Sequence, residues 1–132
     1  MIGIDTNVLV RLLVRDDTDQ ADAALAAIGA YGAAGHRIVL NAINLAELAW
    51  VLRSRFGFGK PQILEKLMQL LDQDDVLAVP ERALHRAVAA WAEGGAGLAD
   101  YLIAELNAEY DCAATLTFDR EAAKHPACEL IS

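Results

Sequence analysis

The sequence predicts an α/β protein in which a mainly parallel sheet lies between layers of helices. Short apolar stretches alternate with longer stretches whose apolar residues recur at helical spacing. Strands separated by helices are joined by right-handed crossovers, which makes neighbouring strands parallel and places helices on both faces of the sheet. The chain has 132 residues, of which 55% are hydrophobic, so we expect one domain, spanning residues 1–132, with a full core.

The strand predicted at residues 1–4 opens the first half of the chain. It is apolar on both alternating faces apart from one glycine, which is typical of a strand buried on both sides. Asp5 follows directly, and the capping types Thr6 and Asn7 lead into a helix at 8–14. Polar, glycine and proline breaks bound the next elements, which are a helix at 20–34, a strand at 37–40 and helices at 42–56 and 60–72.

The second half of the chain repeats the alternation of strand and helix. A strand at 76–79 is closed by Pro80, and residues 94–97 form a glycine-rich exit between two helices. A further strand ends at Asp119, directly before a short helical turn. The remaining predicted elements are helices at 81–93 and 98–110, a strand at 113–118, a turn at 120–124 and a small strand at 129–131.

The composition argues against several classes of protein. No apolar run reaches the roughly 18 residues that a membrane span needs, and no basic-then-apolar leader opens the chain, so we expect a cytoplasmic protein. The net charge of −8 argues against a generic nucleic-acid binder, which is usually basic. The acids can instead bind a metal ion, meet a basic protein partner or solvate the surface.

Cysteine and histidine form no reactive cluster in the sequence. Cys112 and Cys128 are too few for a disulfide scaffold and form no CxxC pair, so we predict buried free thiols. His36, His85 and His125 are scattered in polar or terminal settings, and we predict that they lie on the surface. Walker A, GxGxxG and GxSxG patterns are all absent from the sequence.

Asp5 and Asp119 each end a predicted strand and precede a helix. Either aspartate alone is explained equally well as a helix N-cap. As a pair they are more informative, because parallel strands that end in aspartate place both carboxylates at the same rim of the sheet. If the strands at 1–4 and 113–118 are neighbours, the two carboxylates can lie within bridging distance.

Glu47 and Asp100 lie in apolar stretches, where solvation does not explain them. Glu47 shares a helical stripe with apolar residues such as Trp50, and a charge on such a stripe needs a partner. Asp100 lies in the first turn of its predicted helix. The alternatives to a functional site are a salt bridge from Glu47 to Arg53 or Arg55, and stabilisation of the helix dipole by Asp100.

Four converging carboxylates would require a cation. Two carboxylates about 4 Å apart repel by on the order of 4 kcal/mol at an effective dielectric constant near 20. Oxygen ligands without cysteine or histidine nearby favour Mg²⁺ or Mn²⁺ over Zn²⁺. Glu105 points about 140° away from Asp100 on the same helix, so we expect it to face water or the rim. A haloacid-dehalogenase-like phosphatase is disfavoured, because Asn7 stands where its second aspartate would be.

Four segments together resemble the acidic motifs of the PIN domain, most closely those of the VapC-type toxins of prokaryotic toxin–antitoxin pairs. They are Ile4-Asp5-Thr6-Asn7-Val8-Leu9, Asn44-Leu45-Ala46-Glu47-Leu48, Leu98-Ala99-Asp100-Tyr101-Leu102-Ile103-Ala104 and Leu116-Thr117-Phe118-Asp119-Arg120. They occur in the family's order and span the chain. The resemblance implies a three-layer α/β/α sandwich with a central, mainly parallel sheet of four to five strands. It also implies a Mg²⁺-dependent endoribonuclease that is the toxin of a type II pair.

The resemblance further implies roles for the four acids. Asp5 and Asp100 would be ligands of the Mg²⁺ ion, with Mn²⁺ as the alternative metal. Glu47 and Asp119 would complete the catalytic site, either directly, through water or at a second ion.

Supporting residues and partners are implied in the same way. Thr6 and Asn7 would form hydrogen bonds to the carboxylates or to the substrate. Proteins of this kind are often homodimers and bind a small antitoxin, whose C-terminal segment fills a groove and directs a basic side chain at the acids. The acidic net charge suits such a partner.

RNA would then be held by local basic patches. The candidates are Arg11 and Arg15 on the first predicted helix and Arg53 and Arg55 after Glu47, although all of them also fit solvated helix faces. Single-stranded or looped RNA is the expected substrate, because a shallow groove with few basic residues cannot read a duplex deeply. The functional alternative is a catalytically silent protein of this fold that acts only through partner binding or autoregulation.

Overall fold

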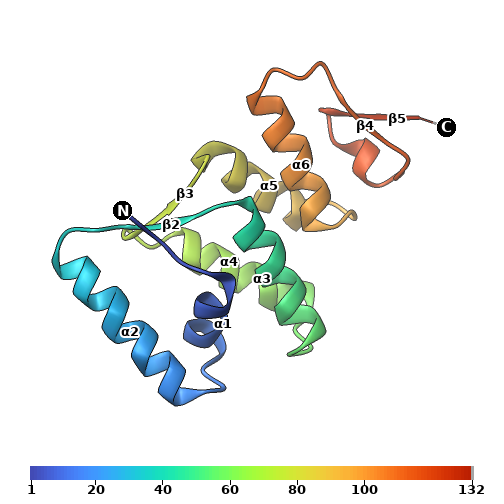
Figure 1. Cartoon of the computed structure of the whole chain (residues 1–132). Coiled ribbons are helices and arrows are strands. Elements are labelled where there is room, and N and C mark those ends of the chain that lie inside the picture. The colour runs from blue at the N-terminus through green and yellow to red at the C-terminus, as the bar shows by residue number, and fades with distance from the viewer. Residues whose placement is uncertain (132) are drawn as a thin grey trace. The chain divides into compact units, whose positions relative to one another are not determined.

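The computed structural model describes residues 1–131 and divides the chain into two compact units, Met1–Ala78 and Val79–Ser132 (Figure 1). Each unit contains its own helices and its own parallel sheet. The predicted α/β class with parallel strands is confirmed, and its five strands are divided between a three-stranded and a two-stranded sheet. Within residues 1–131, no helix is long and apolar enough to cross a membrane.

The N-terminal unit alternates strands with pairs of helices. Its sheet has the order β1-β2-β3, so β2 is central and β1 is an edge strand. Ile38 of β2 pairs with Ile2 on one side and with Val76 on the other. The elements of this unit are β1 (Ile2–Gly3), α1 (Thr6–Val14), α2 (Thr18–Ala33), β2 (Ile38–Leu40), α3 (Ala42–Ser54), α4 (Lys60–Leu71) and β3 (Val76–Ala78).

Aliphatic side chains of α1, α3 and α4 form the core of the N-terminal unit, and α3 contacts both other helices. Asn41 begins α3 through a capping box, in which its side chain accepts from the backbone N–H of Ile43 and of Asn44. Burying each large aliphatic side chain contributes roughly 1.5–3 kcal/mol, so the leucine stripe fixes how α3 is turned. The largest fully buried side chains of this unit are Leu9, Val10, Leu40, Leu45, Leu48, Leu52, Ile63 and Leu67.

The face of α3 that carries Glu47 is not covered, contrary to the prediction from its apolar stripe. Ile43 and Trp50 on this face are 69% and 70% exposed, and Glu47 is exposed as well. Two apolar stripes compete for the core in this helix, and the one with more leucines is buried. That stripe consists of Leu45, Leu48 and Leu52.

The C-terminal unit combines two packed helices with a small parallel sheet. The turn between the helices requires glycine at position 94, because a Cβ atom on Gly94 would collide with the hydroxyl of Tyr101. The elements of this unit are α5 (Glu81–Glu93), α6 (Leu98–Glu109), β4 (Thr115–Thr117), η1 (Ala122–Lys124) and β5 (Cys128–Leu130).

Both strands that precede a motif aspartate are less buried than the sequence predicts. In β1, Ile2 is half-buried and Gly3 is exposed, because an edge strand has a neighbour on one side only. In β4, Leu116 is 61% exposed. The apolar composition of these strands therefore does not mark a position in the middle of a sheet.

Both cysteines are free, as predicted, but the prediction that their thiols are buried is wrong. Cys112 is exposed, and Cys128 at the start of β5 is half-buried. Cys112 follows Asp111, whose φ of 57° marks the left-handed turn between α6 and β4. Cys112 thus lies outside the regular elements, in the turn, whereas Cys128 belongs to a strand that pairs with β4.

Candidate functional site

The end of β1 and the start of α3 are joined by a chain of hydrogen bonds. The Thr6 hydroxyl donates to Oε1 of Glu47 at 2.9 Å and accepts from Nδ2 of Asn44 at 3.3 Å. Nδ2 of Asn44 also donates to the carbonyl oxygen of Ile4 at 3.2 Å. Thr6 and Asn44 are buried, so losing these hydrogen bonds would be costly. The network therefore holds the Glu47 carboxylate against the segment that contains Asp5.

Asn44 is part of this network, although sequence reasoning assigns it no role. Its Oδ1 accepts from the backbone N–H of Asn41 at 3.0 Å, while its amide group serves Thr6 and Ile4. Asn44 thus ties the cap of α3 to the segment after β1. A polar residue among apolar neighbours, three positions before Glu47, is the signal that could have identified it.

Asp5 is exposed and is only weakly engaged as a helix cap. It is the N-cap residue of α1, but its Oδ1 lies 3.5 Å from the backbone nitrogen of Asn7. This distance is at the long end of the hydrogen-bond range. Because Asn7 contributes only this long bond, the Asp5 carboxylate is available to another ligand.

Asp100 and Asp119 lie in the C-terminal unit, where both accept backbone hydrogen bonds. Oδ2 of Asp100 accepts from the N–H of Gly97 at 3.1 Å in the first turn of α6. Oδ1 of Asp119 accepts from the N–H groups of Glu121 and Ala122 at 2.8 Å and 2.9 Å, directly before η1. Within residues 1–131, these bonds occupy one oxygen of each carboxylate and leave the other oxygen to a ligand.

The donor atoms of the predicted site residues are all oxygens. The N-terminal unit supplies the carboxylates of Asp5 and Glu47, and the C-terminal unit supplies those of Asp100 and Asp119. Over residues 1–131, neither unit gathers three or more histidine, cysteine, aspartate or glutamate side chains around a point that could hold a metal ion. Carboxylate donors of this kind fit a hard cation such as Mg²⁺ or Mn²⁺.

The Asp100 carboxylate acts electrostatically on Cys128. Partial burial raises the pKa of the Cys128 thiol above its ordinary value, and the negative charge of Asp100 raises it further. The thiol therefore stays protonated at neutral pH.

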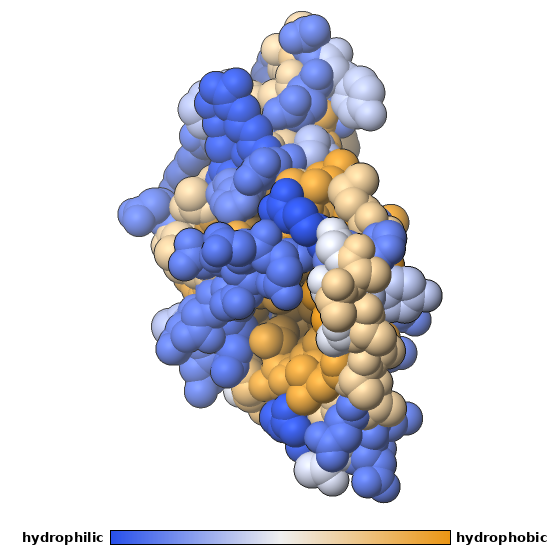
Figure 2. All heavy atoms as spheres, turned by 90° about the vertical axis from the view of Figure 1, so that its left-hand side faces the viewer, coloured by the Kyte–Doolittle hydropathy of each residue, from blue (hydrophilic) through white to orange (hydrophobic). Residues whose placement is uncertain are grey.

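An apolar groove of about 430 Å³ lies in the N-terminal unit between α2 and the segment formed by β1 and the start of α1. A hollow with hydrophobic walls is visible on the face that carries α2 (Figure 2). Ala21 is the one buried residue of α2, so the rest of this helix is at least partly exposed. The groove is lined by Ile2, Gly3, Ile4, Asp5, Val8, Ala24, Ala27, Ile28 and Tyr31. Asp5 thus gives an otherwise apolar groove one negative charge.

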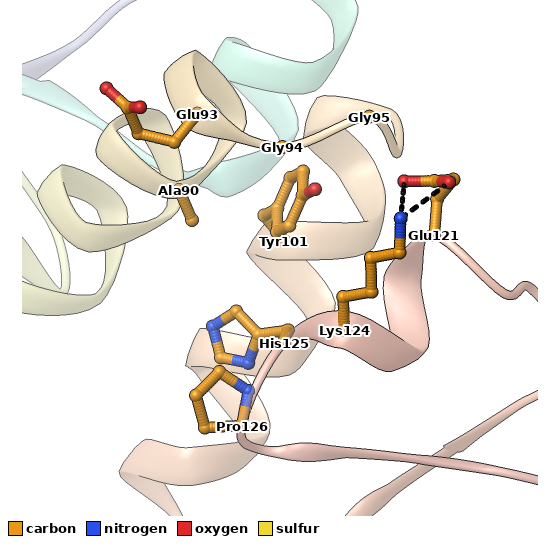
Figure 3. Close-up of a pocket in the computed structure, with 9 residues that line it drawn as sticks. All are labelled: Ala90, Glu93, Gly94, Gly95, Tyr101, Glu121, Lys124, His125 and Pro126. Atoms are coloured by element: carbon orange, nitrogen blue, oxygen red, sulfur yellow. Dashed lines mark hydrogen bonds and ion pairs between the residues drawn. The ribbon is translucent and has the colours of Figure 1, made fainter.

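A second pocket, of about 340 Å³, lies in the C-terminal unit beside the turn between α5 and α6 (Figure 3). His125 lines it, and its Nε2 lies 2.9 Å from Oε1 of Glu105 while its Nδ1 accepts from the N–H of Ala127. Since Nδ1 is an acceptor, Nε2 carries the hydrogen and donates the hydrogen bond to Glu105. The two side chains are 11% and 13% exposed, so the prediction that His125 lies on the surface is wrong. Of the two positions predicted for Glu105, water or the rim, the burial of its side chain excludes water. His85 is exposed, as predicted, whereas His36 is half-buried.

Two of the arginines predicted to contact RNA are already paired with acids. Arg11 forms an ion pair with Asp16 at 3.1 Å, and Arg15 forms one with Asp22 at 3.2 Å. An arginine whose charge is compensated in this way attracts a phosphate less strongly than a free one. The Arg15–Asp22 pair reaches α2 and the Arg11–Asp16 pair reaches the turn before it, which gives both arginines a structural role.

Arg53 and Arg55 are exposed, and in the part of the chain that the structure describes no acid pairs with either of them. The guanidinium of Arg55 lies over the ring of Phe56, 5.5 Å from its centroid. The partner of Glu47 is thus Thr6 and not one of these arginines. Sequence reasoning overlooked a further exposed basic group on α5, which consists of Arg82, His85 and Arg86.

The PIN domain family model matches residues 2–127, a range that includes all four acidic segments. Comparisons with curated proteins and with solved structures found no match.

Proposed function

Since the chain belongs to the PIN domain family, we propose that it is a Mg²⁺-dependent endoribonuclease and the toxic component of a type II toxin–antitoxin pair. PIN domains are generally nucleases and typically use divalent metal ions. The finer assignment is supported by the four acidic segments, whose closest resemblance is to VapC-type toxins. Its substrate would be single-stranded or looped RNA in the cytoplasm.

The observation that carries the proposal is the orientation of the Glu47 carboxylate by a buried threonine. An exposed glutamate that merely solvates a helix has no need of a hydrogen-bonded chain through Thr6 and Asn44. Metal ligands, in contrast, are usually held in place by such supporting hydrogen bonds. The network therefore favours a ligand role for Glu47 over a solvation role.

We assign Asp5 and Asp100 as ligands of Mg²⁺, with Mn²⁺ as the alternative ion. Glu47 and Asp119 complete the site, either directly, through water or at a second ion. When bound, the cation supplies a water of lowered pKa for attack on the phosphorus and offsets negative charge on the phosphate. Thr6 keeps one oxygen of Glu47 fixed through its hydrogen bond. The carboxylate therefore loses less conformational entropy when it binds a ligand.

Cleavage of single-stranded RNA by the purified chain tests this function. EDTA should stop cleavage and excess Mg²⁺ should restore it. Asp5→Asn and Asp100→Asn should each lower kcat/KM by about 100-fold or more, because each removes a ligand of an ion that stabilises the transition state by several kcal/mol. Asp74→Asn, in the exposed turn before β3, is the matched control and should cut like the wild type. A motif variant that is fully active in Mg²⁺ would disprove the assignment.

The alternative function is a catalytically silent protein that acts through partner binding or autoregulation. The apolar groove beside α2 favours partner binding, whether or not the protein is also an enzyme. Folded wild-type protein that binds a partner but cleaves no RNA with either Mg²⁺ or Mn²⁺ would support this alternative.

We propose an antitoxin segment as the occupant of this groove, with a basic side chain directed at Asp5. The apolar walls, the carboxylate and the net charge of −8 all suit such a partner. Ile28→Asp places a charge in the wall and should abolish co-purification with the product of a neighbouring short reading frame. Leu25→Asp, on α2 but outside the groove, should not. Equal co-purification of both variants would argue against the groove. A homodimer, which the resemblance also implies, is tested by sedimentation.

A further inference from the structure

Helix α5 carries a group of basic side chains on the side that its own unit does not bury. Arg82, His85 and Arg86 are all exposed, and together with Glu81 they line an open hollow of about 410 Å³. The opposite side of α5 is apolar, and the helix packs against α6. The buried residues of α5 are Ala83, Leu84, Ala87, Val88 and Trp91. The basic group therefore faces solvent, where a ligand can reach it.

The charges of this basic group are uncompensated. Among residues 1–131, neither Arg82 nor Arg86 pairs with an acid, and His85 has no partner either. Other arginines of the chain are engaged, since Arg15 pairs with an acid of α2 and Arg37 donates to two backbone carbonyl oxygens. The arginines of α5 thus remain free to bind an anion.

The stability of α5 does not account for these two arginines. Arg82 is the second residue of the helix, and a cation at a helix N-terminus opposes the helix dipole. Arg86 follows four residues later, and like charges at this spacing repel each other. No acid lies three or four residues from either arginine, although the chain has 19 acidic and only 11 basic residues. An arrangement that disfavours the helix points to a role in binding.

We propose that Arg82 and Arg86 bind adjoining phosphates of the single-stranded RNA substrate and that His85 donates a ring N–H to one of them. The inference rests on the proposed ribonuclease function and adds a substrate-binding surface to it, in the unit that carries Asp100 and Asp119. Guanidinium groups bind phosphate oxygens through paired hydrogen bonds. Two of them about 6 Å apart along a helix axis give two successive contacts to one strand. Such contacts hold the strand without reading its bases.

Glu81, the acid beside the hollow, lies on its other flank. At about 100° per residue, Arg82 and Arg86 lie about 40° apart around the helix, whereas Glu81 lies about 140° from Arg86. His85 lies between Glu81 and the two arginines. A phosphate bound on the arginine flank therefore avoids the carboxylate.

A protein partner is the competing occupant of this surface. In a two-fold contact between two copies centred on the basic group, arginines would face arginines and repel each other, because such an interface pairs a surface with itself. A different protein would normally bury an apolar interface core. Over residues 1–131, none of the large apolar side chains that are exposed belongs to α5. A surface with charges but no apolar anchor suits the phosphates of a nucleic acid better than a protein.

The salt dependence of binding tests the proposal. The affinity of the full chain for a fluorescein-labelled oligoribonucleotide of about ten nucleotides is measured by anisotropy in EDTA, which prevents cleavage. Arg82→Gln and Arg86→Gln should each reduce the slope of log K against log salt by about 0.7, and the double variant by about 1.4. At about 0.1 M salt these slopes correspond to roughly 5-fold weaker binding for each single variant and roughly 25-fold for the double variant. Arg82→Lys keeps the charge and should keep the slope.

Two further variants separate binding from general effects of charge and stability. Lys124→Gln removes the same charge from a cation that is paired with Glu121 at 3.0 Å, so its slope should match the wild type. Arg82→Glu places an acid in the first turn of α5, four residues before Arg86, where it suits the helix dipole. It should bind RNA more weakly than Arg82→Gln yet unfold at the wild-type temperature or above. A structural role for Arg82 would instead lower the unfolding temperature.

An unchanged salt slope in the double variant, or an equal reduction in Lys124→Gln, would overturn the proposal. A labelled peptide of about ten glutamates should bind more weakly than RNA, because it releases fewer condensed counterions. If the peptide binds as tightly as RNA and the double variant loses that binding, the surface belongs to an acidic protein instead. The nuclease function fails independently, if Mg²⁺ restores no cleavage, because the binding assay in EDTA does not measure cleavage.

Discussion

Thr6 connects the Glu47 carboxylate, which needs a hydrogen-bond donor, with the Asn44 amide, which needs an acceptor. Its hydroxyl donates a hydrogen bond to the Glu47 carboxylate and accepts one from the Asn44 amide. Both bonds join residues about forty positions apart in the chain, so they form only when the segment after β1 docks on α3. The orientation of Glu47 is therefore a consequence of folding in the N-terminal unit.

Thr6→Val should impair both stability and cleavage. It keeps the shape of the side chain but removes the donor to Glu47, so we expect a loss of about 1–2 kcal/mol in the free energy of unfolding. kcat/KM for RNA cleavage should fall as well, because Glu47 loses its fixed orientation. Thr6→Ser restores the hydroxyl and should recover most of both quantities. Urea denaturation and RNA cleavage measure the two effects, and full activity of Thr6→Val would show that the orientation of Glu47 is unimportant.

The two thiols should differ in reactivity. Iodoacetamide reacts with the thiolate, and a raised pKa leaves less thiolate at any given pH. Partial burial and the charge of Asp100 raise the pKa of Cys128, so its alkylation at about pH 8 should be slower than that of exposed Cys112 and should accelerate at higher pH. Asp100→Asn removes one of the two causes and should speed the reaction of Cys128. Mass spectrometry of timed samples distinguishes the sites, and equal rates for both thiols would contradict this explanation.

Two motif aspartates differ in how strongly their side chains hold the backbone that follows them. Asp119 accepts two backbone N–H groups at 2.8 Å and 2.9 Å, whereas Asp5 lies 3.5 Å from its single donor. Without metal, Asp119→Ala should therefore cost about 1 kcal/mol of stability. Asp5→Ala should cost much less, because it loses a weaker cap and relieves negative charge. Thermal unfolding in EDTA compares the two, and a larger loss for Asp5→Ala would assign it a mainly structural role.

The bounds of the helices follow from local chemistry and were predictable. Asn41 caps α3, Pro61 lies in the first turn of α4, and glycines separate α5 from α6. The predicted and observed ends of these helices accordingly differ by only one or two residues, as at 42–56 against Ala42–Ser54. Capping signals lie within a few residues of the helix end, so they can be read without knowledge of the tertiary structure.

The burial of individual faces was less predictable, because it depends on residues distant in sequence. In α3, two neighbouring stripes are apolar, and docking against α1 and α4 selects the leucine stripe over the one that contains Trp50. The apolar composition of β1 predicts a strand in the middle of a sheet, yet β1 has a neighbouring strand on one side only. The pairing of His125 with Glu105 is likewise a tertiary contact without a local signal.

The candidate site as a whole combines both kinds of information. The order and spacing of the four acidic segments could be read from the sequence, and the family match over residues 2–127 agrees with them. The supporting bonds around Glu47 could not, because Asn44 and Thr6 are distant in sequence. The structure adds what motifs cannot show, namely that Glu47 is held, that Asp5 is weakly capped and that Arg11 and Arg15 are already paired.

The central proposal is that the motif carboxylates Asp5 and Asp100 serve one metal-dependent reaction. It is tested most directly by comparing Mg²⁺-dependent RNA cleavage by Asp5→Asn, Asp100→Asn and the double variant. If both carboxylates serve the same cation, the double variant should lose no more kcat/KM than the more damaging single change, because the second carboxylate has nothing left to support. A double variant whose loss equals the product of the two single losses, or a single variant that cuts as fast as the wild type, would contradict the claim.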